Sequence, residues 1–402
     1  MLPTSPQPAS KSISIVLMVL LLFVTQACTD IFLPGLPQIA REFNSSIEVA
    51  SLTISVYNVC QALVVLVIGV VSDVRGRRPT LLVCFGLHIL ATIAIALCSS
   101  MAVMIALRAV QALGSAAVYI VLRMIIKDTL AKPAQIHATG LLTIGLVLSP
   151  MLAPLVGSMV LHWSNWRNCF WLLCALEAPL FLWAVLAIRE TNLRRAELAA
   201  TFSWAGHARD YAGVLGDRFF LGMALLVGAA FAAFYAFISI SPFLFIDQFG
   251  MRASTYGAIF MALALSYLAG NRLMSALNAR GLAAPRIIGI GVMVSAAGAA
   301  CVLAGAMAPV ALAIAAIALG TCLLRLATAL IVPPAQVEVS NFFAQRGAHA
   351  LGLLTGIQYG FAALGTVVVS NLWFTPSTNF SISTLLFVVL AALGLLAVRR
   401  RR

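Results

Sequence analysis

Charged side chains are scarce in this chain of 402 residues: Asp, Glu, Lys and Arg make up only 9% of it, whereas hydrophobic residues make up 62%. A soluble globular protein is about half apolar and about a quarter charged. The mean hydropathy of +1.05 lies far outside the range of such proteins. The composition therefore excludes a soluble enzyme, a secreted disulfide scaffold, a nucleic-acid-binding domain and a disordered protein. It leaves a membrane protein that crosses the bilayer many times.

Motifs for nucleotides, metals and covalent catalysis are also absent. There is no G-x-x-x-x-G-K-[ST] loop, no H-E-x-x-H and no nucleophile elbow, and the eight cysteines have no paired spacing. Without the first motif, ATP is not the energy source. Cysteines inside apolar runs act as small hydrophobic residues. We therefore expect no enzyme activity, no metal site, no disulfides and no cofactor.

Long apolar runs are abundant instead. A helix needs roughly 20 apolar residues to cross a bilayer. The first run follows Lys11 and is predicted to be a span and not a signal peptide, because no A-x-A-like cleavage site follows it. The twelve predicted spans are 12–35, 48–71, 80–99, 101–125, 135–161, 167–188, 218–246, 253–277, 286–306, 309–331, 348–373 and 380–398.

The positive charges give these spans an orientation. If the N-terminus is cytoplasmic, 19 of the 25 Lys and Arg residues lie on the cytoplasmic side, and three (Arg41, Arg167 and Arg252) lie on the other side. Such a bias is the positive-inside signal of membrane proteins. The net charge of +13 is therefore explained by topology and predicts no nucleic-acid partner. Both termini are expected in the cytoplasm.

One hydrophilic stretch divides the chain. Residues 189–217 follow the sixth span and are predicted to be a cytoplasmic loop between an N-terminal half, 1–188, and a C-terminal half, 218–402. The loop Arg75-Gly-Arg-Arg-Pro79 after span two resembles Arg280-Gly-Leu-Ala-Ala-Pro-Arg286 after span eight. This similarity fits two duplicated halves around a central site.

Several motifs concentrate in the N-terminal half. Gly69-x-x-x-Asp73-x-x-Gly76-Arg77-Arg78-Pro79 lies between spans two and three, and Asp30-Ile-Phe-Leu-Pro34-Gly-Leu-Pro37 ends span one. Arg108-Ala-Val-Gln111-Ala-Leu-Gly114 lies in span four. Span five contains a run of small residues and prolines that favours a kinked, closely packed helix. Its motif residues are Gly145, Ser149, Pro150, Ala153, Pro154 and Gly157.

Together these motifs resemble the major facilitator superfamily, and within it the twelve-helix drug:proton antiporter branch with its Bcr/CflA and MdfA-type members. The resemblance implies an all-α bundle of twelve transmembrane helices in two six-helix halves. It also implies a monomer in the bacterial inner membrane that exports small amphiphilic compounds and is driven by the proton gradient. A dedicated exporter of a siderophore or another secreted metabolite is the alternative, and a non-transporting sensor is a third. Val74 stands where the family has Arg, so the partner of Asp73 stays open.

Three charged residues inside spans are candidates for proton coupling. An ionised group in hydrocarbon costs several kcal/mol, so it needs a partner or a function. Asp30 and Arg108 are expected at similar depth in the membrane. Three roles stay open for Asp30: a proton carrier, a structural partner of Arg108, or a helix cap. Glu177 in span six either binds protons or cations, pairs with Arg325, or stays protonated without a role.

Polar and aromatic residues in the cavity-facing helices form the predicted substrate site. As a set they describe an amphiphilic cavity for a small molecule. Arg325 in span ten is interpreted as an anchor for an anionic group or as a structural partner. The set is Tyr57, Asn58, Gln61, Tyr119, Phe234, Tyr235, Arg325, Gln358 and Tyr359.

Overall fold

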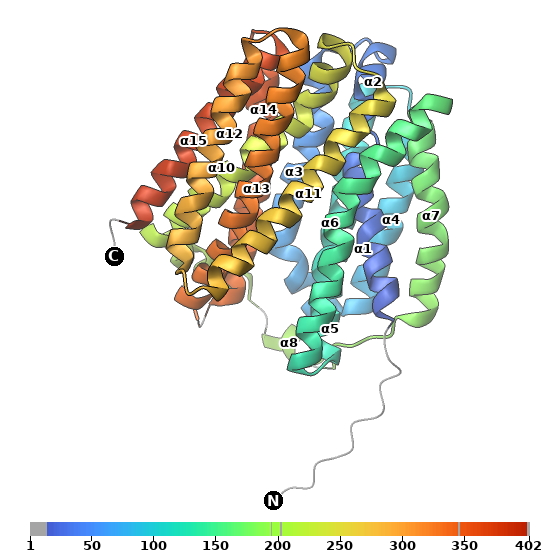
Figure 1. The fold of residues 1–402 in the computed structure, drawn as a ribbon. Coiled ribbons are helices and arrows are strands. Elements are labelled where there is room, and N and C mark those ends of the chain that lie inside the picture. The colour runs from blue at the N-terminus through green and yellow to red at the C-terminus, as the bar shows by residue number, and fades with distance from the viewer. Residues whose placement is uncertain (1–13, 194, 202, 345, 400–402) are drawn as a thin grey trace, which may run out of the picture.

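The computed structural model describes residues 14–193, 195–201, 203–344 and 346–399, which form helices joined by short turns, without a strand (Figure 1). The elements are α1 (Ile15–Asp30), η1 (Leu33–Gly35), α2 (Leu36–Glu42), α3 (Ile47–Arg75), α4 (Arg77–Leu97), α5 (Met101–Thr129), α6 (Lys132–Trp163), α7 (Arg167–Ala187), α8 (Arg195–Thr201), α9 (Trp204–Leu215), α10 (Arg218–Pro242), the π-helical turn η2 (Phe243–Gln248), α11 (Ala253–Ala279), α12 (Ala284–Ala306), α13 (Val310–Phe342), α14 (Gly347–Ser370) and α15 (Pro376–Arg399).

The twelve predicted spans correspond to twelve long helical segments among the described residues. Eleven are long and apolar enough to cross a membrane among the described residues. The predicted span 135–161 corresponds to the twelfth, α6, a continuous helix of 32 residues. The all-α bundle expected from the sequence is confirmed.

The first span is longer than predicted. It continues beyond residue 35, through η1 and α2, and ends at Glu42. Pro34 and Pro37 do not stop it, because each lies in the first turn of a new helical segment, where a proline lacks no needed N–H donor. The break between α1 and η1 directly follows Asp30 and sets this residue at the end of a helix.

The stretch 189–217 is more ordered than the predicted loop, because it contains α8 and α9. Ser203 caps α9 by accepting from the Gly206 N–H at 3.3 Å. The Tyr211 hydroxyl then donates to the Leu66 carbonyl oxygen of α3 at 2.9 Å. A helix of the connecting segment is thereby attached to a helix of the N-terminal half.

The two groups of helices lie side by side, with α1 and α4–α7 on the right of Figure 1 and α10 and α12–α15 on the left. They meet along α3 with α14 and along α6 with α11. At Gly257 of α11, an added Cβ would lie 2.9 Å from the Leu155 Cα and 3.2 Å from the Pro154 carbonyl oxygen. A side chain there would separate the two backbones.

The bundle has two distinct ends. The α2 end holds η1, α2 and η2, which contact one another and the adjoining helices of the other group. There Arg41 Nη1 lies 2.8 Å from Asp247 Oδ1. The α8 end holds α8 (Figure 1) and the turn between α3 and α4, where Arg195 Nη1 lies 3.5 Å from the Arg75 carbonyl oxygen.

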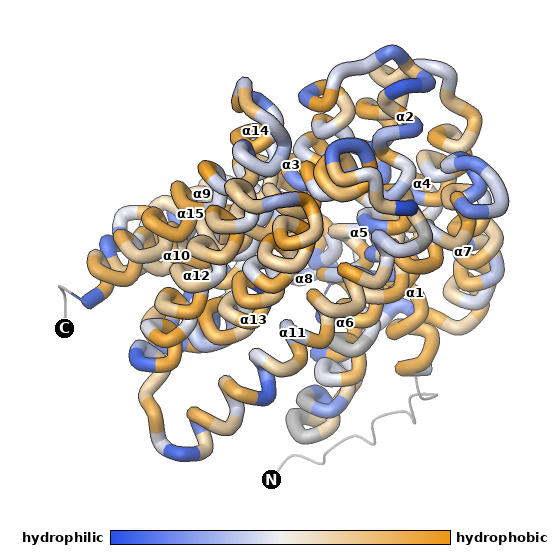
Figure 2. The backbone as a smooth tube through the Cα atoms, turned by 45° about the horizontal axis from the view of Figure 1, so that its top comes forward, coloured by the Kyte–Doolittle hydropathy of each residue, from blue (hydrophilic) through white to orange (hydrophobic). Residues whose placement is uncertain are grey.

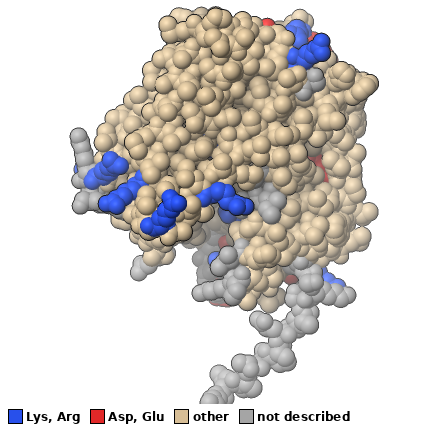
Figure 3. All heavy atoms as spheres, viewed as in Figure 1, with Lys and Arg blue, Asp and Glu red and all other residues tan. Residues whose placement is uncertain are grey.

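Polarity follows the same axis. Hydrophobic residues dominate the helices, and the hydrophilic ones gather toward the turns (Figure 2). Figure 3 shows the flank of the bundle nearly free of charge, with Lys and Arg side chains gathered mainly in its lower part. An uncharged flank between polar ends is what a hydrocarbon layer requires.

Candidate functional site

Asp30 is the last residue of α1, at the break between α1 and η1. It is 7% exposed. Among the described residues it has no ion-pair partner within 4.0 Å, so the predicted direct pair with Arg108 is not formed. Arg325 and Arg108 are the cations whose charge acts on its carboxyl group, Arg325 more strongly. Asp30 is therefore a buried acid that two positive charges influence without an ion pair to either.

Arg108 of α5 is satisfied without a carboxylate. Its Nε donates to the Thr53 carbonyl oxygen at 3.2 Å, and its Nη1 donates to the Cys28 carbonyl oxygen at 3.0 Å and to Gln111 Oε1 at 2.5 Å. The guanidinium also lies over the ring of Tyr57, with 4.2 Å from Cζ to the ring centroid. These neighbours hold a fixed positive charge where α1, α3 and α5 meet, since cation–π and carbonyl contacts both stabilise a buried cation.

Glu177 pairs with His88, so the predicted partner Arg325 is wrong. Glu177 Oε1 lies 3.0 Å from His88 Nε2, and both side chains are fully buried. A helical wheel of an almost uniformly apolar span gives no facing direction, so the sequence did not reveal which helix Glu177 faces. His88 was missed entirely; its signal was a lone ionisable residue inside span three.

Arg325 of α13 lacks an anionic partner in the described part of the chain. Its Cζ lies 3.9 Å from the ring centroid of Phe234 and 4.5 Å from that of Tyr267. It lines a small cavity with Phe234, Tyr267, Pro150 of α6 and Phe260 of α11. Because Pro150 belongs to the N-terminal half, this cavity lies between the halves and holds a cation between aromatic faces.

Three of the predicted lining residues are buried within the N-terminal half. The Tyr57 hydroxyl lies 2.5 Å from Ser115 Oγ, and Gln61 Nε2 donates to the same oxygen at 3.2 Å. Asn58 Nδ2 donates to the Ile54 carbonyl oxygen at 3.0 Å. In this conformation, Tyr57 and Gln61 join α3 to α5, and Asn58 Oδ1 is buried without a hydrogen-bond partner among the described residues.

Of the remaining predicted lining residues, Phe234, Tyr235 and Tyr359 form an aromatic group around α10 together with Phe231. The ring of Phe231 lies 5.8 Å from Tyr235 and 6.3 Å from Tyr359, centroid to centroid. Tyr119 of α5 lies under Arg123, at 5.1 Å. Gln358 is 7% exposed, and its Oε1 has no hydrogen-bond partner among the described residues. Tyr235, Tyr359 and Gln358 combine apolar and polar groups, and the amphiphilic substrate site that they would line stays a prediction.

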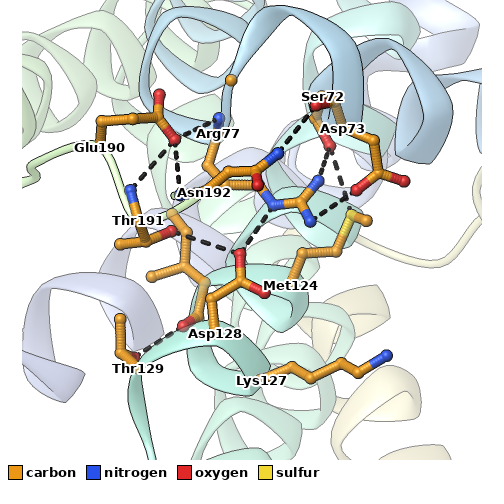
Figure 4. Close-up of polar contacts among 12 residues, drawn as sticks. Ser72, Asp73, Arg77, Met124, Lys127, Asp128, Thr129, Glu190, Thr191 and Asn192 are labelled. Carbon is orange, nitrogen blue, oxygen red and sulfur yellow. Dashed lines mark hydrogen bonds and ion pairs between the residues drawn. The ribbon is translucent and has the colours of Figure 1, made fainter. Parts of the chain in front are cut away.

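The glycine-rich turn after α3 resolves the question left open for Asp73. Its Oδ1 lies 2.7 Å from Arg77 Nη2, and Arg77 Nε lies 2.9 Å from Asp128 Oδ2 of α5 (Figure 4). Arg77 Nη1 also donates to Ser72 Oγ at 2.8 Å. Arg75, which follows the position where the family has Arg, is not needed, because Arg77, one turn after Asp73, ties α3, α4 and α5 together.

Glu190, which the sequence analysis missed, caps α4 from the other side of this turn. Its Oε1 accepts from the Arg77 N–H at 2.9 Å (Figure 4). Its Oε2 accepts from the Arg78 N–H at 3.2 Å. Burial raises the pKa of Glu190, but four backbone donors (the N–H groups of Asn192, Arg77, Arg78 and Thr191) outweigh it and hold the pKa below its usual value. Gly76 has φ +103°, and an added Cβ would collide with Glu190.

Two glycines of α6 are required for its close packing, whereas Gly69 of α3 is not required for packing. An added Cβ on Gly157 would overlap the Ile31 carbonyl oxygen, and one on Gly145 would lie 2.8 Å from the Val19 carbonyl oxygen. These glycines therefore bring α6 against α1, as predicted, and Pro150 and Pro154 lie inside α6. Gly69 differs, since the nearest atom to its added Cβ is 3.9 Å away; close packing does not require glycine there.

A comparison with known families agrees with the fold and the motifs. The profile described as Major Facilitator Superfamily matches residues 18–370, most of the chain. The chain belongs to the Major Facilitator Superfamily. This family consists of membrane transporters that move small molecules, and it is not generally one of enzymes.

Curated relatives are distant. The chain is 27% identical over 244 residues to the uncharacterized MFS-type transporter YdgK of Bacillus subtilis, covering 60% of each chain. It is 28% identical over 280 residues to the multidrug transporter MdfA of Yersinia pestis, covering 69% of this chain and 67% of that one. It is 27% identical to the multidrug resistance protein MdtL of Escherichia coli, covering 60% of each. The alignments thus span about 60% of the length of YdgK and MdtL.

Solved structures share the fold along nearly the whole chain. A bacterial homologue of the human lysosomal transporter Spinster, in an inward-facing and unoccupied conformation, superposes with a TM-score of 0.74 at 17% identity, covering 97% of this chain and 98% of that one. A D-xylose–proton symporter gives a TM-score of 0.71 at 15% identity, covering 95% of both chains. At these identities the similarity establishes the fold alone.

Proposed function

We propose that this transporter exports small amphiphilic compounds across the bacterial inner membrane in exchange for protons. The observation that carries the proposal is Asp30: a buried carboxyl group at a helix break, acted on by two cations and paired with neither. Such a group is stabilised as an anion by the positive charges and as a neutral acid by burial. A small change in hydration or ligand is then enough to transfer its proton.

The orientation follows the positive-inside bias, so the α8 end and both termini face the cytoplasm and the α2 end faces the periplasm. The halves 1–188 and 218–402 move against each other, and the segment 189–217 connects them. Contacts at Gly257 and between Arg41 and Asp247 join the halves at the α2 end. Substrate enters from the cytoplasm and meets the aromatic group around α10.

Proton and substrate exchange at one acid in this scheme. Protonation of Asp30 from the periplasmic side removes its attraction to Arg325 and Arg108 and favours the state open to the cytoplasm. Substrate binding against Phe234 and Tyr235 then restores the anion, and the proton leaves to the cytoplasm. Because either the proton or the substrate occupies the site, the transporter does not change between its two states while the site is empty. Such changes of the empty transporter would dissipate the proton gradient.

The test measures proton release from purified protein in weakly buffered detergent solution. Fluorescent lipophilic cations, neutral compounds and carboxylates of similar size serve as a substrate panel. Asp30→Asn should fold, since a neutral group is cheaper to bury than a charge, and it should release no protons when substrate is added. Glu48→Gln, which changes an exposed acid in the first turn of α3, is the control and should release as many as the wild type. Equal release by Asp30→Asn would transfer the role to another group.

A dedicated exporter of one anionic metabolite is the second candidate, and Arg325 favours it. The guanidinium faces a cavity between the halves and has no carboxylate partner among the described residues. An anionic group of a substrate would supply that partner. In the same panel, Arg325→Gln should then lose carboxylates and retain neutral compounds. Unchanged carboxylate transport by this variant would remove the support for a dedicated anion exporter.

A further inference from the structure

We propose that His88 and Glu177 form a second proton-binding site, separate from Asp30, whose single proton holds Arg108 in place through Gln111. The expected effect on transport rests on the proposed proton-coupled export, whereas the proton-binding site itself does not. The site lies between α4, α5 and α7, outside the cavity between the halves. Both side chains are fully buried.

Hydrogen-bond geometry requires one proton between the two side chains. His88 Nδ1 lies 2.9 Å from the Gln111 carbonyl oxygen, and a carbonyl oxygen only accepts, so Nδ1 carries a hydrogen. The 3.0 Å contact from Nε2 to Glu177 Oε1 then needs a second hydrogen. It belongs either to an imidazolium that faces a carboxylate or to a carboxylic acid that faces a neutral imidazole. Without it, two lone pairs would oppose each other in a buried site.

If this proton is lost, no other described group donates a hydrogen bond to the Glu177 carboxylate. Glu177 Oε2 is buried and has no hydrogen-bond partner among the described residues, so the contact with His88 is the one described bond of this carboxyl group. A buried carboxylate left without a partner is strongly destabilising. Deprotonation must therefore move the His88 ring or the Glu177 side chain, and the occupancy of the site is coupled to its geometry.

The His88 ring cannot move without disturbing α5. At Gly114, an added Cβ would lie 2.5 Å from the Cys84 carbonyl oxygen and closer still to the Cβ of His88, so α4 and α5 are in direct backbone contact here. Thr92 Oγ1 donates to the His88 carbonyl oxygen and accepts from Gln111 Nε2, both at 2.8 Å. Gln111 is therefore held to α4 by its backbone and its side chain together.

Gln111 passes this constraint to Arg108. Its Oε1 accepts from Arg108 Nη1 at 2.5 Å, and the same Nη1 donates to the Cys28 carbonyl oxygen at 3.0 Å. Cys28 precedes Asp30 by two residues on α1. A continuous series of hydrogen bonds thus leads from Glu177 on α7, through α4 and α5, to the backbone beside Asp30.

Few other groups can influence the pair. The thiols of Cys28 on α1 and Cys174 on α7 interact electrostatically with His88 and Glu177, respectively. Cys84 lies one turn before His88 on α4. The nearest cation in the hydrogen-bond series, Arg108, is separated from the pair by Gln111. On α3, the Tyr57 hydroxyl reaches the Cys28 Sγ at 3.4 Å.

The first experiment needs neither substrate nor transport. The apparent melting temperature of purified protein is measured between about pH 7 and 10, where loss of the shared proton would leave a carboxylate beside a neutral imidazole. Occupancy of the site stabilises the fold, so wild-type melting should fall as pH rises and the proton is lost. Glu177→Gln should remove this part of the fall, because an amide keeps a hydrogen bond to His88 without titrating. Asp30→Asn and His349→Gln are the controls and should keep the wild-type slope. A wild-type slope in Glu177→Gln would overturn the proposal.

The second experiment tests the connection to Arg108. Gln111→Leu keeps the backbone carbonyl for His88 and removes the side chain that holds Arg108. Glu177→Leu, which removes the hydrogen bond to His88, and Gln111→Leu should each lower proton-driven transport about threefold or more, and the double variant should be no worse than the poorer single one, since coupled residues are not additive. Multiplicative losses would show that the pair acts independently of Arg108. If no compound is transported at all, the proposed function fails while the melting experiment still decides whether the second site exists.

Discussion

Removing the charge of Glu190 should weaken the turn at the α8 end by a measurable amount. In Glu190→Gln, one amide oxygen can still accept from the N–H groups that Oε1 serves, but an amide nitrogen replaces either Oε2 or Oε1. If the amide nitrogen replaces Oε2, it faces the Arg78 N–H, which lies 3.2 Å from Oε2 in the wild type. Two donors then face each other. A hydrogen bond to a charged group contributes about 1.5–3 kcal/mol, against about 1 for a neutral one.

The expected loss follows from these contacts. A negative charge at a helix N-terminus adds about 0.3–1 kcal/mol, and the half-buried position of Glu190 reduces every such contribution through solvent screening. We therefore expect Glu190→Gln to lower the free energy of unfolding by about 1–2 kcal/mol at neutral pH. Chemical denaturation of the purified protein, followed by tryptophan fluorescence, measures it. Glu48→Gln, an exposed acid in the first turn of α3, is the matched control.

The pH dependence of this difference has a definite sign. Because the folded-state pKa of Glu190 is below its usual value of 4.5, its stabilisation is fully present above that value and is lost as the pH falls through the folded pKa. The gap between wild type and Glu190→Gln should therefore close in acid. A gap no larger than that of Glu48→Gln at pH 7, or one that stays constant down to pH 3, would refute the capping role.

Three further predictions concern topology, the turn and the packing of α6. A reporter inserted in 195–210 should show a cytoplasmic location, and an active periplasmic reporter there would contradict the proposed orientation. Asp73→Asn breaks the 2.7 Å contact with Arg77 but leaves Asp128 in place, so transport should slow several-fold with substrate affinity nearly unchanged; wild-type transport rates would count against it. Gly157→Ala should destabilise the protein by about 1–3 kcal/mol in thermal unfolding, as overpacking does, whereas Gly140→Ala, with nothing within 4 Å of the added Cβ, should not.

The number and order of the spans could be predicted because hydropathy is a local property that each segment carries by itself. Helix ends were harder. The span that contains Asp30 was expected to stop at residue 35, yet it runs to Glu42, since its prolines begin new helical turns. The hydrophilic stretch 189–217 was expected to be a loop and contains two short helices, whose order depends on tertiary contacts such as the one from Tyr211 to Leu66.

Side-chain partners could not be predicted, because a helix that is apolar all round does not reveal its rotation. Depth placed Asp30 and Arg108 near each other, and the structure brings them into electrostatic range without contact. Depth also suggested Arg325 for Glu177, but Glu177 faces α4 and His88. Tyr57 carries a polar tip that suits a cavity equally well on sequence grounds, and it is turned toward Ser115 instead.

The ion pair between Arg41 and Asp247 makes the α2 end sensitive to the surrounding solution. The side chains are 67% and 39% exposed, and exposed pairs contribute only about 0.2–1 kcal/mol, less at high salt. A difference of about 1 kcal/mol changes the ratio of two states about fivefold, so this contact biases the two halves without locking them. Ionic strength at the α2 end should therefore shift the ratio of the two conformational states. In a dilute medium, a larger fraction of the molecules would be closed at the α2 end than in a medium of high salt.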